Sequence, residues 1–281
     1  MAMTINTNII SLDAQRNASA NQSVLATSMQ RLSSGLRVNS AKDDAAGLAI
    51  ADRMNTQVRG MNVAIRNAND GISLAQVAEG GLSGVTDILQ RMRELAVQSI
   101  NSTNTSSDIS ALNQEYTQLS QELARNMSSV EFNGTPLFTT TADYQFQVGA
   151  NVGQTVTISA SDLGVATGAI TGVLAGSGAA SALSTSANSD NSANLSAIDD
   201  ALNAVNSSRA TLGAIQSRFT QTITYLQTAV ENQTAARGRI MDADFAAETA
   251  NLSRAQILQQ AGTAMIAQAN QMPQSVLQLL K

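Results

Sequence analysis

The sequence LQQAGTAMIAQANQMPQSVLQL occupies residues 258–279 of the 281-residue chain and repeats an apolar side chain at every seventh position. The repeated residues are Leu258, Met265, Met272 and Leu279. A seven-residue apolar repeat forms one continuous stripe along a helix, and such a stripe lets the helix pack lengthwise against another helix. The stretch therefore predicts a C-terminal helix that serves assembly.

The N-terminal segment carries a similar repeat. Ile5 and Leu12 are seven residues apart, and Leu25 and Leu32 are too. We therefore predict a second assembly helix here, able to pair in the antiparallel direction with the C-terminal one. The residues expected to form the assembly core are Ile5, Ile9, Leu12, Leu25, Met29, Leu32, Leu258, Met265, Met272, Leu277, Leu279 and Leu280.

The composition favours long helices over a thick globular core. Hydrophobic residues make up 43% of the chain, but aromatic residues make up only 3% and Trp is absent. Ala, Leu, Ile, Val and Met pack well in narrow helical seams. The chain has only two prolines, Pro136 and Pro273, so little interrupts a long helix.

Several functional classes are excluded by composition. The chain contains no His and no Cys, which removes His general bases, Cys nucleophiles, thiolate metal sites and disulfides. We therefore expect no enzyme activity, no cofactor and no metal; a zinc protease would need a His-Glu-x-x-His helix. The net charge is −5 and no basic cluster is present, which argues against nucleic acid as a partner. The sequence contains no run of 18 apolar residues, the length that could span a membrane.

Three further helices are expected between the two ends. A long helix over about 44–99 carries its seven-step row on Met54, Met61, Ala68, Ala75, Leu82, Leu89 and Ala96. Gly80, Gly81 and Gly84 are expected to weaken or bend it. The next helix has Ile109, Tyr116, Leu123 and Val130 in one row, and a return helix beginning near Leu195 has Ile198, Val205, Leu212, Phe219 and Leu226.

A small β region is expected between these helices. Asn133-Gly134 is a hairpin turn signal, and Tyr144, Phe146 and Val148 alternate with polar residues as in a strand. Residues 164–193 are rich in Gly, Ala, Ser and Thr and predict a short, loop-rich remnant. Asp242 and Asp244 could form a paired-carboxylate site, but they lack the rest of a binding loop and are better explained as helix caps.

The predicted fold class is mainly α: a long antiparallel helical coiled-coil or bundle rod with a small β-hairpin region at its tip. Its predicted parts are terminal coiled-coil helices (1–40 and 243–281), a helical rod with β-hairpins (41–163 and 194–242) and the remnant. A single helix with one apolar stripe buries too little surface to offset its ordering entropy. We therefore expect both ends to be disordered in the monomer and helical after assembly.

Five sequence motifs resemble those of bacterial flagellin, the flagellar filament subunit. LSSGLRVNSAKDDAAGLAIA at 32–51 resembles its N-terminal signature, and residues 91–99 and 132–138 resemble the next two motifs. Residues 253–263 and 267–281 resemble its C-terminal signature. The resemblance covers about 1–140 and 194–281, and the motifs occur in the family's order.

The resemblance implies a structural protein that polymerises into an extracellular helical tube for swimming motility. In that family the terminal helices form the inner tube, and the variable middle segment forms outer domains. Because the middle segment is short here, we expect the outer domains to be absent or vestigial. The resemblance also implies flagellar type III export of the unfolded chain without a cleaved signal peptide. That route agrees with the order of Ile9, Ile10 and Arg16, because a secretory signal has its basic residues first. The implied partners are an export chaperone, the filament cap and hook–filament junction proteins; the alternative is that the chain is itself such a junction protein.

The resemblance also implies recognition by host innate immune receptors. The Toll-like flagellin receptor contacts the segment that corresponds to Gln90, Arg91, Glu94, Leu95 and Gln98, with Glu115 on the neighbouring helix. NAIP-type sensors read the C-terminal helix, where Leu277, Leu279 and Leu280 match the expected leucines. Spacing alone would make Arg91, Arg93 and Glu94 an ordinary solvated face, with ion pairs of ~0.2–0.5 kcal/mol each.

Overall fold

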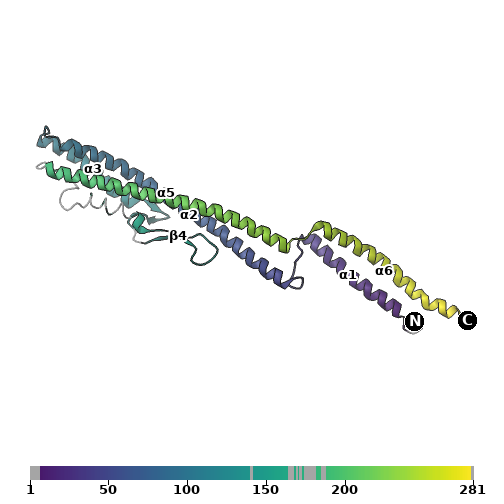
Figure 1. Cartoon of the computed structure of the whole chain (residues 1–281). Coiled ribbons are helices and arrows are strands. Elements are labelled where there is room, and N and C mark those ends of the chain that lie inside the picture. Colours follow the sequence, from purple (N-terminus) through teal and green to yellow (C-terminus); the bar gives the residue numbers. More distant parts are fainter. Residues whose placement is uncertain are drawn as a thin grey trace. The chain divides into compact units, whose positions relative to one another are not determined.

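The computed structural model describes residues 7–139, 142–163, 168, 170, 173, 182–184 and 188–279; side chains are not described for 188–190 and 273–279. Five long helices dominate the described residues, and two short antiparallel hairpins accompany them (Figure 1). The predicted mainly α fold with a small β-hairpin region is therefore confirmed. The helices are α1 (Ile9–Ser34), α2 (Ala45–Ser99), α3 (Ser106–Ser129), α5 (Asn188–Met241) and α6 (Phe245–Leu279).

The chain divides into two compact units. Unit 1 comprises residues 1–57 and 231–281, and unit 2 comprises residues 58–230. Helices α2 and α5 contribute to both units, so these boundaries fall inside helices. The sequence analysis separated the terminal helices (1–40 and 243–281) from the rod by their expected roles in a polymer. That separation stays a prediction.

The core of unit 2 lies between α2, α3 and α5. The predicted seven-step row of α2 is confirmed where it enters this core, because five of its members are fully buried: Ala68, Ala75, Leu82, Leu89 and Ala96. Tyr116 of α3 and Phe219 of α5 are 0% exposed and pack into the same cluster. Burial raises the pKa of Tyr116 to about 12, so this phenol stays neutral at physiological pH.

Gly81 of α2 allows close packing against neighbouring side chains. α2 is continuous from Ala45 to Ser99 and includes Gly80, Gly81 and Gly84. A Cβ at Gly81 would lie 2.8 Å from Val130 Cγ2 and 3.0 Å from Phe138 Cε2. These side chains therefore occupy the space that the missing methyl group leaves, and the lost helix propensity is offset by close contact.

The β region matches its predicted turn chemistry. β1 (Glu131–Phe132) pairs antiparallel with β2 (Thr135–Pro136), and β3 (Tyr144–Gln147) pairs with β4 (Thr155–Ile158). At the first turn Asn133 has φ 51° and Gly134 has φ 75°. Two successive positive φ values are what an Asn-Gly hairpin turn requires.

The middle segment departs from its prediction where it is described. α5 begins at Asn188, before the predicted start at Leu195, so residues 188–193 are helical and not part of a loop. Asn191 and Asn194 are fully buried, and their side-chain amides donate to the carbonyls of Ser184 (3.1 Å) and Ala182 (3.0 Å). The rest of 164–187, apart from the single residues and short stretch named above, lies outside the described residues.

Backbone hydrogen bonds join the segment after α1 to the segment around the end of α5 within unit 1. Gly35 ends α1 in the left-handed region (φ 72°), and its N–H donates to the Arg31 carbonyl at 2.8 Å. The Arg37 N–H donates to the Met241 carbonyl at 2.6 Å, and the Ala243 N–H to the Gly35 carbonyl at 2.9 Å. These backbone bonds hold the end of α1 beside the end of α5.

Candidate assembly and recognition surfaces

Helices α1 and α6 pair in the antiparallel direction within unit 1 (Figure 1). The Asn8 side-chain amide at the start of α1 donates to the Ala269 carbonyl at 2.7 Å. Near the other end of α1, Arg31 lies 3.9 Å from Glu248 at the start of α6. The two terminal helices thus form the antiparallel pair expected from the sequence.

The contact between α1 and α6 uses mainly small and polar side chains. Ser11, Ser28, Ala255 and Ala269 are buried there, and a Cβ at Gly262 would lie 3.8 Å from that of Ala18. Most buried and half-buried positions alternate in steps of three and four, as in a coiled coil. The positions in these steps are Ser11, Ala14, Ala18, Asn21, Leu25, Ser28 and Leu32 on α1, and Glu248, Leu252, Ala255, Gln259, Gly262, Ile266 and Ala269 on α6. Thr27, Arg31 and Asn251 are also half-buried.

Most of the large apolar residues of the terminal helices lie outside this seam and are exposed. Among the predicted assembly residues, Met265 is 60% exposed, Ile9 is 62% exposed and Leu258 is 43% exposed. We call the exposed large hydrophobic residues of α1 and α6 the outer apolar face. Its members are Ile9, Ile10, Leu12, Val24, Met29, Phe245, Ile257, Leu258, Met265 and Met272.

The remaining predicted assembly residues lie elsewhere or are not described. Leu25 and Leu32 are half-buried in the seam between α1 and α6. Leu277 and Leu279 belong to α6, but their side chains are outside the described residues, as are Ile5 and Leu280 altogether. The C-terminal seven-step row that the sequence revealed is thus on the outer apolar face where it is described, and not in the seam within the chain.

A charged cluster connects α2 to α3 in unit 2. Arg91 Nε and Nη2 donate to Glu115 Oε1 at 2.8 and 2.7 Å, and Arg91 Nη1 donates to Glu94 Oε2 at 2.8 Å. The hydrogen bond that Arg91 donates to Glu94, followed by those that it donates to Glu115, raises the pKa of Arg91. The guanidinium is held in one orientation while half of the side chain stays exposed, so it can contact a partner.

The predicted recognition residues divide into an exposed set and a buried one. Gln90 and Gln98 are exposed, as are the three charged residues of the cluster. Leu95 is 1% exposed and belongs to the core of unit 2, on the inner side of α2 between Met92 and Ser99. Contact of this residue with a receptor stays a prediction.

Sequence reasoning missed an ion pair between α2 and α5. Arg93 Nε donates to Asp199 Oδ1 at 2.6 Å, and this bond raises the pKa of Arg93. Arg93 was expected to be part of a solvated face only. Because its partner is far away in the sequence, no local spacing could have revealed the pair.

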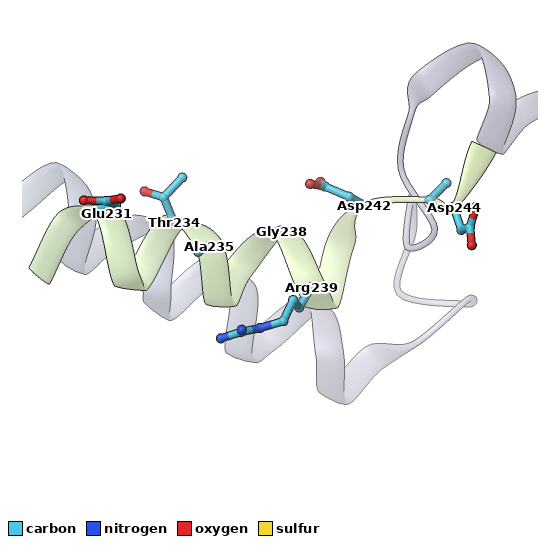
Figure 2. A pocket seen from close by; sticks show the side chains of 8 residues that line it. Glu231, Thr234, Ala235, Gly238, Arg239, Asp242 and Asp244 are labelled. Carbon is cyan, nitrogen blue, oxygen red and sulfur yellow. The ribbon is translucent and has the colours of Figure 1, made fainter. Parts of the chain in front are cut away.

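Asp244, just before the start of α6, acts as a helix cap. Asp244 Oδ1 accepts from the Ala246 N–H at 2.9 Å and from the Ala247 N–H at 3.2 Å, as predicted. Figure 2 shows that Asp242 and Asp244 line an open groove but point in different directions. Within the described part of the chain, no group of three or more His, Cys, Asp or Glu side chains could hold a metal ion. No helix described here is long and apolar enough to cross a bilayer.

The fold and these surfaces define a class of protein: a helical protein whose paired terminal helices leave large apolar side chains exposed. Comparison with known proteins specifies the family. Residues 5–143 match the bacterial flagellin N-terminal helical region, and residues 195–280 match the bacterial flagellin C-terminal helical region. The chain therefore belongs to the bacterial flagellins.

Three relatives are similar over the whole length. The flagellin of Halalkalibacterium halodurans is 46% identical, and the alignment covers 99% of this chain and 100% of the relative. The flagellin of Bacillus subtilis is 41% identical, with 99% and 100% covered. The flagellar filament 33 kDa core protein of Treponema phagedenis is 40% identical, again with 99% and 100% covered. Flagellins are structural proteins rather than enzymes, and this chain is a self-polymerising filament subunit of the extracellular flagellum.

Proposed function

We propose that the outer apolar face drives polymerisation of this flagellin into the tubular filament used for swimming. The observation that carries the proposal is the exposure of large apolar residues on both terminal helices, from 38% at Met272 to 66% at Ile257. Large apolar side chains exposed along two paired helices are available for contacts with other protein surfaces. Each large side chain that becomes buried contributes ~1.5–3 kcal/mol.

The seam within the chain leaves this surface available. Because small and polar residues fill the contact between α1 and α6, the larger residues remain for neighbouring subunits. A head-to-tail contact whose rotation does not close produces a helical polymer instead of a ring. One subunit can therefore offer its outer apolar face to several neighbours along a filament.

Growth of the pure protein on short filament seeds, followed by electron microscopy, tests this function. The expected result is long, thin filaments that extend from the seeds. Persistent monomer, closed rings or amorphous aggregate would contradict the proposal.

The route to the filament tip is part of the same proposal. The chain leaves the cell unfolded through the flagellar type III channel, a chaperone shields the C-terminal helix before export, and cap and hook–filament junction proteins guide incorporation. Filament subunit is preferred over hook–filament junction protein because the relatives matched over their whole length are filament proteins.

A second proposed role is that of a ligand for the Toll-like flagellin receptor of hosts. The supporting observation is the orientation of the Arg91 guanidinium by Glu94 and Glu115 on an exposed face. NAIP-type sensors would instead read the leucines at the end of α6.

We expect Arg91→Ala to weaken receptor signalling by the monomer about 30-fold, since a central interface arginine contributes ~2 kcal/mol or more. The loss arises from the missing contact and not from unfolding, because an exposed ion pair contributes little to stability. A reporter-cell titration measures the effect. Arg93→Ala, on the same helix and paired with Asp199, is the matched control. An unchanged response to Arg91→Ala, or an equal loss from both variants, would count against the receptor role.

A further inference from the structure

Methionine is the most abundant easily oxidised residue in this chain. The chain contains no Cys, no His and no Trp, but it contains ten Met. Thioether sulfur is therefore the main target in this protein for a two-electron oxidant such as hydrogen peroxide. Any response of the subunit to such an oxidant must be sought at its methionines.

Burial differs widely among the methionines that the structure describes. Met92, Met127 and Met241 are at most 8% exposed, so an oxidant in solution cannot easily reach their sulfur atoms. Met29 of α1 is 55% exposed and Met265 of α6 is 60% exposed, more than Met272 of α6 at 38%. Met29 and Met265 are thus the most accessible methionines of the outer apolar face, one on each terminal helix.

We propose that Met29 and Met265 are modification sites at which oxidation of the free subunit blocks its incorporation into the filament. This inference rests on the proposed function, because it requires the outer apolar face to become buried between subunits. The modification acts before assembly, since burial in the polymer would afterwards hide both sulfur atoms from the oxidant.

The reaction needs only peroxide as a co-reactant. A sulfur lone pair attacks one peroxide oxygen, the O–O bond breaks, and the other oxygen takes up a proton and leaves as water. Sulfur is oxidised by two electrons to the sulfoxide and peroxide is reduced. The product carries a polar S=O group, and placing that group in an apolar contact without a donor is unfavourable.

The modification is also reversible in principle. Methionine sulfoxide reductases return the sulfoxide to the thioether with electrons from a thiol, and one enzyme serves each sulfoxide epimer. Restoration by both enzymes would separate the effect of the sulfoxide from irreversible damage to the chain.

A modification-interference experiment on the intact protein tests the proposal without any substitution. Free subunits are oxidised partially with hydrogen peroxide, allowed to extend seeds, and separated into filament and unincorporated fractions. Mass spectrometry of peptides then gives the sulfoxide content of each methionine in each fraction. Met54 and Met61 of α2, which are half-buried and outside the outer apolar face, are internal controls.

We expect sulfoxide at Met29 and Met265 to be depleted about tenfold or more from the filament fraction, the change that one unsatisfied polar group in an apolar contact produces. Sulfoxide at the two control residues should be shared equally. Treatment of the unincorporated fraction with both reductases should restore growth. Equal sulfoxide contents at Met29 and Met265 in the two fractions would overturn the inference. Failure of unoxidised subunits to extend seeds would instead overturn the proposed function.

Discussion

Leu258→Asp is expected to stop growth on filament seeds while leaving the fold of the free subunit unchanged. Leu258 is 43% exposed in the single chain, so a carboxylate is solvated there and costs little. In the polymer the same carboxylate would be enclosed among apolar side chains without a cation. Even a few kcal/mol per contact then lowers the association constant by a factor of ~100 or more.

Gln256→Asp is the matched control for this prediction. Gln256 is exposed on the same helix but is polar, and the substitution adds the same charge. Electron microscopy of seeded solutions and circular dichroism of the monomers would be measured for both variants. Filaments of normal length from Leu258→Asp, or equal failure of both variants, would refute the assignment of the outer apolar face.

Phe219→Ala is expected to destabilise unit 2 by ~3–5 kcal/mol, the usual cost of removing a large buried aromatic side chain. Phe219 is 0% exposed, and its ring meets that of Phe146 edge to face, with centroids 5.6 Å apart. A Cβ at Gly71 would lie 2.6 Å from Phe219 Cζ, so the α2 backbone approaches the ring closely. Truncation would leave a cavity that these rigid neighbours cannot fill.

Urea unfolding followed by circular dichroism would measure this change. Tyr225→Ala is the control, because Tyr225 is an aromatic residue of the same helix that is 72% exposed. We expect it to change the free energy of unfolding by less than ~0.5 kcal/mol. A loss below ~1 kcal/mol for Phe219→Ala would mean that the core between α2 and α5 is not packed as described.

The sequence was informative wherever one periodic pattern had one explanation. The row from Ala68 to Ala96 could only face a helical core, and it does. The terminal helices were harder, because each carries two stripes. The prediction followed the stripe of large residues, whereas the chain pairs with itself through the stripe that contains Ser11, Ser28 and Gly262, where small side chains permit close approach.

Polar contacts over long sequence distances could not be predicted at all. Asn113 accepts the Leu183 N–H at 2.7 Å, and Asn191 and Asn194 bond the backbone on either side of it. Asn is typical of turns and loops when only local sequence is considered. Its side-chain amide can also satisfy a buried backbone, and that role depends on the tertiary fold.

The central claim is that neighbouring subunits complete the burial of α1 and α6. Hydrogen exchange measured on free subunits and on filaments tests it most directly. The account predicts fast amide exchange at residues 9–34 and 245–272 in the free subunit and exchange slowed by a factor of ~100 or more in the filament. The α2 segment 82–95 should exchange slowly in both states, because its core is complete within one chain. Strong protection of residues 9–34 in the free subunit would contradict the account.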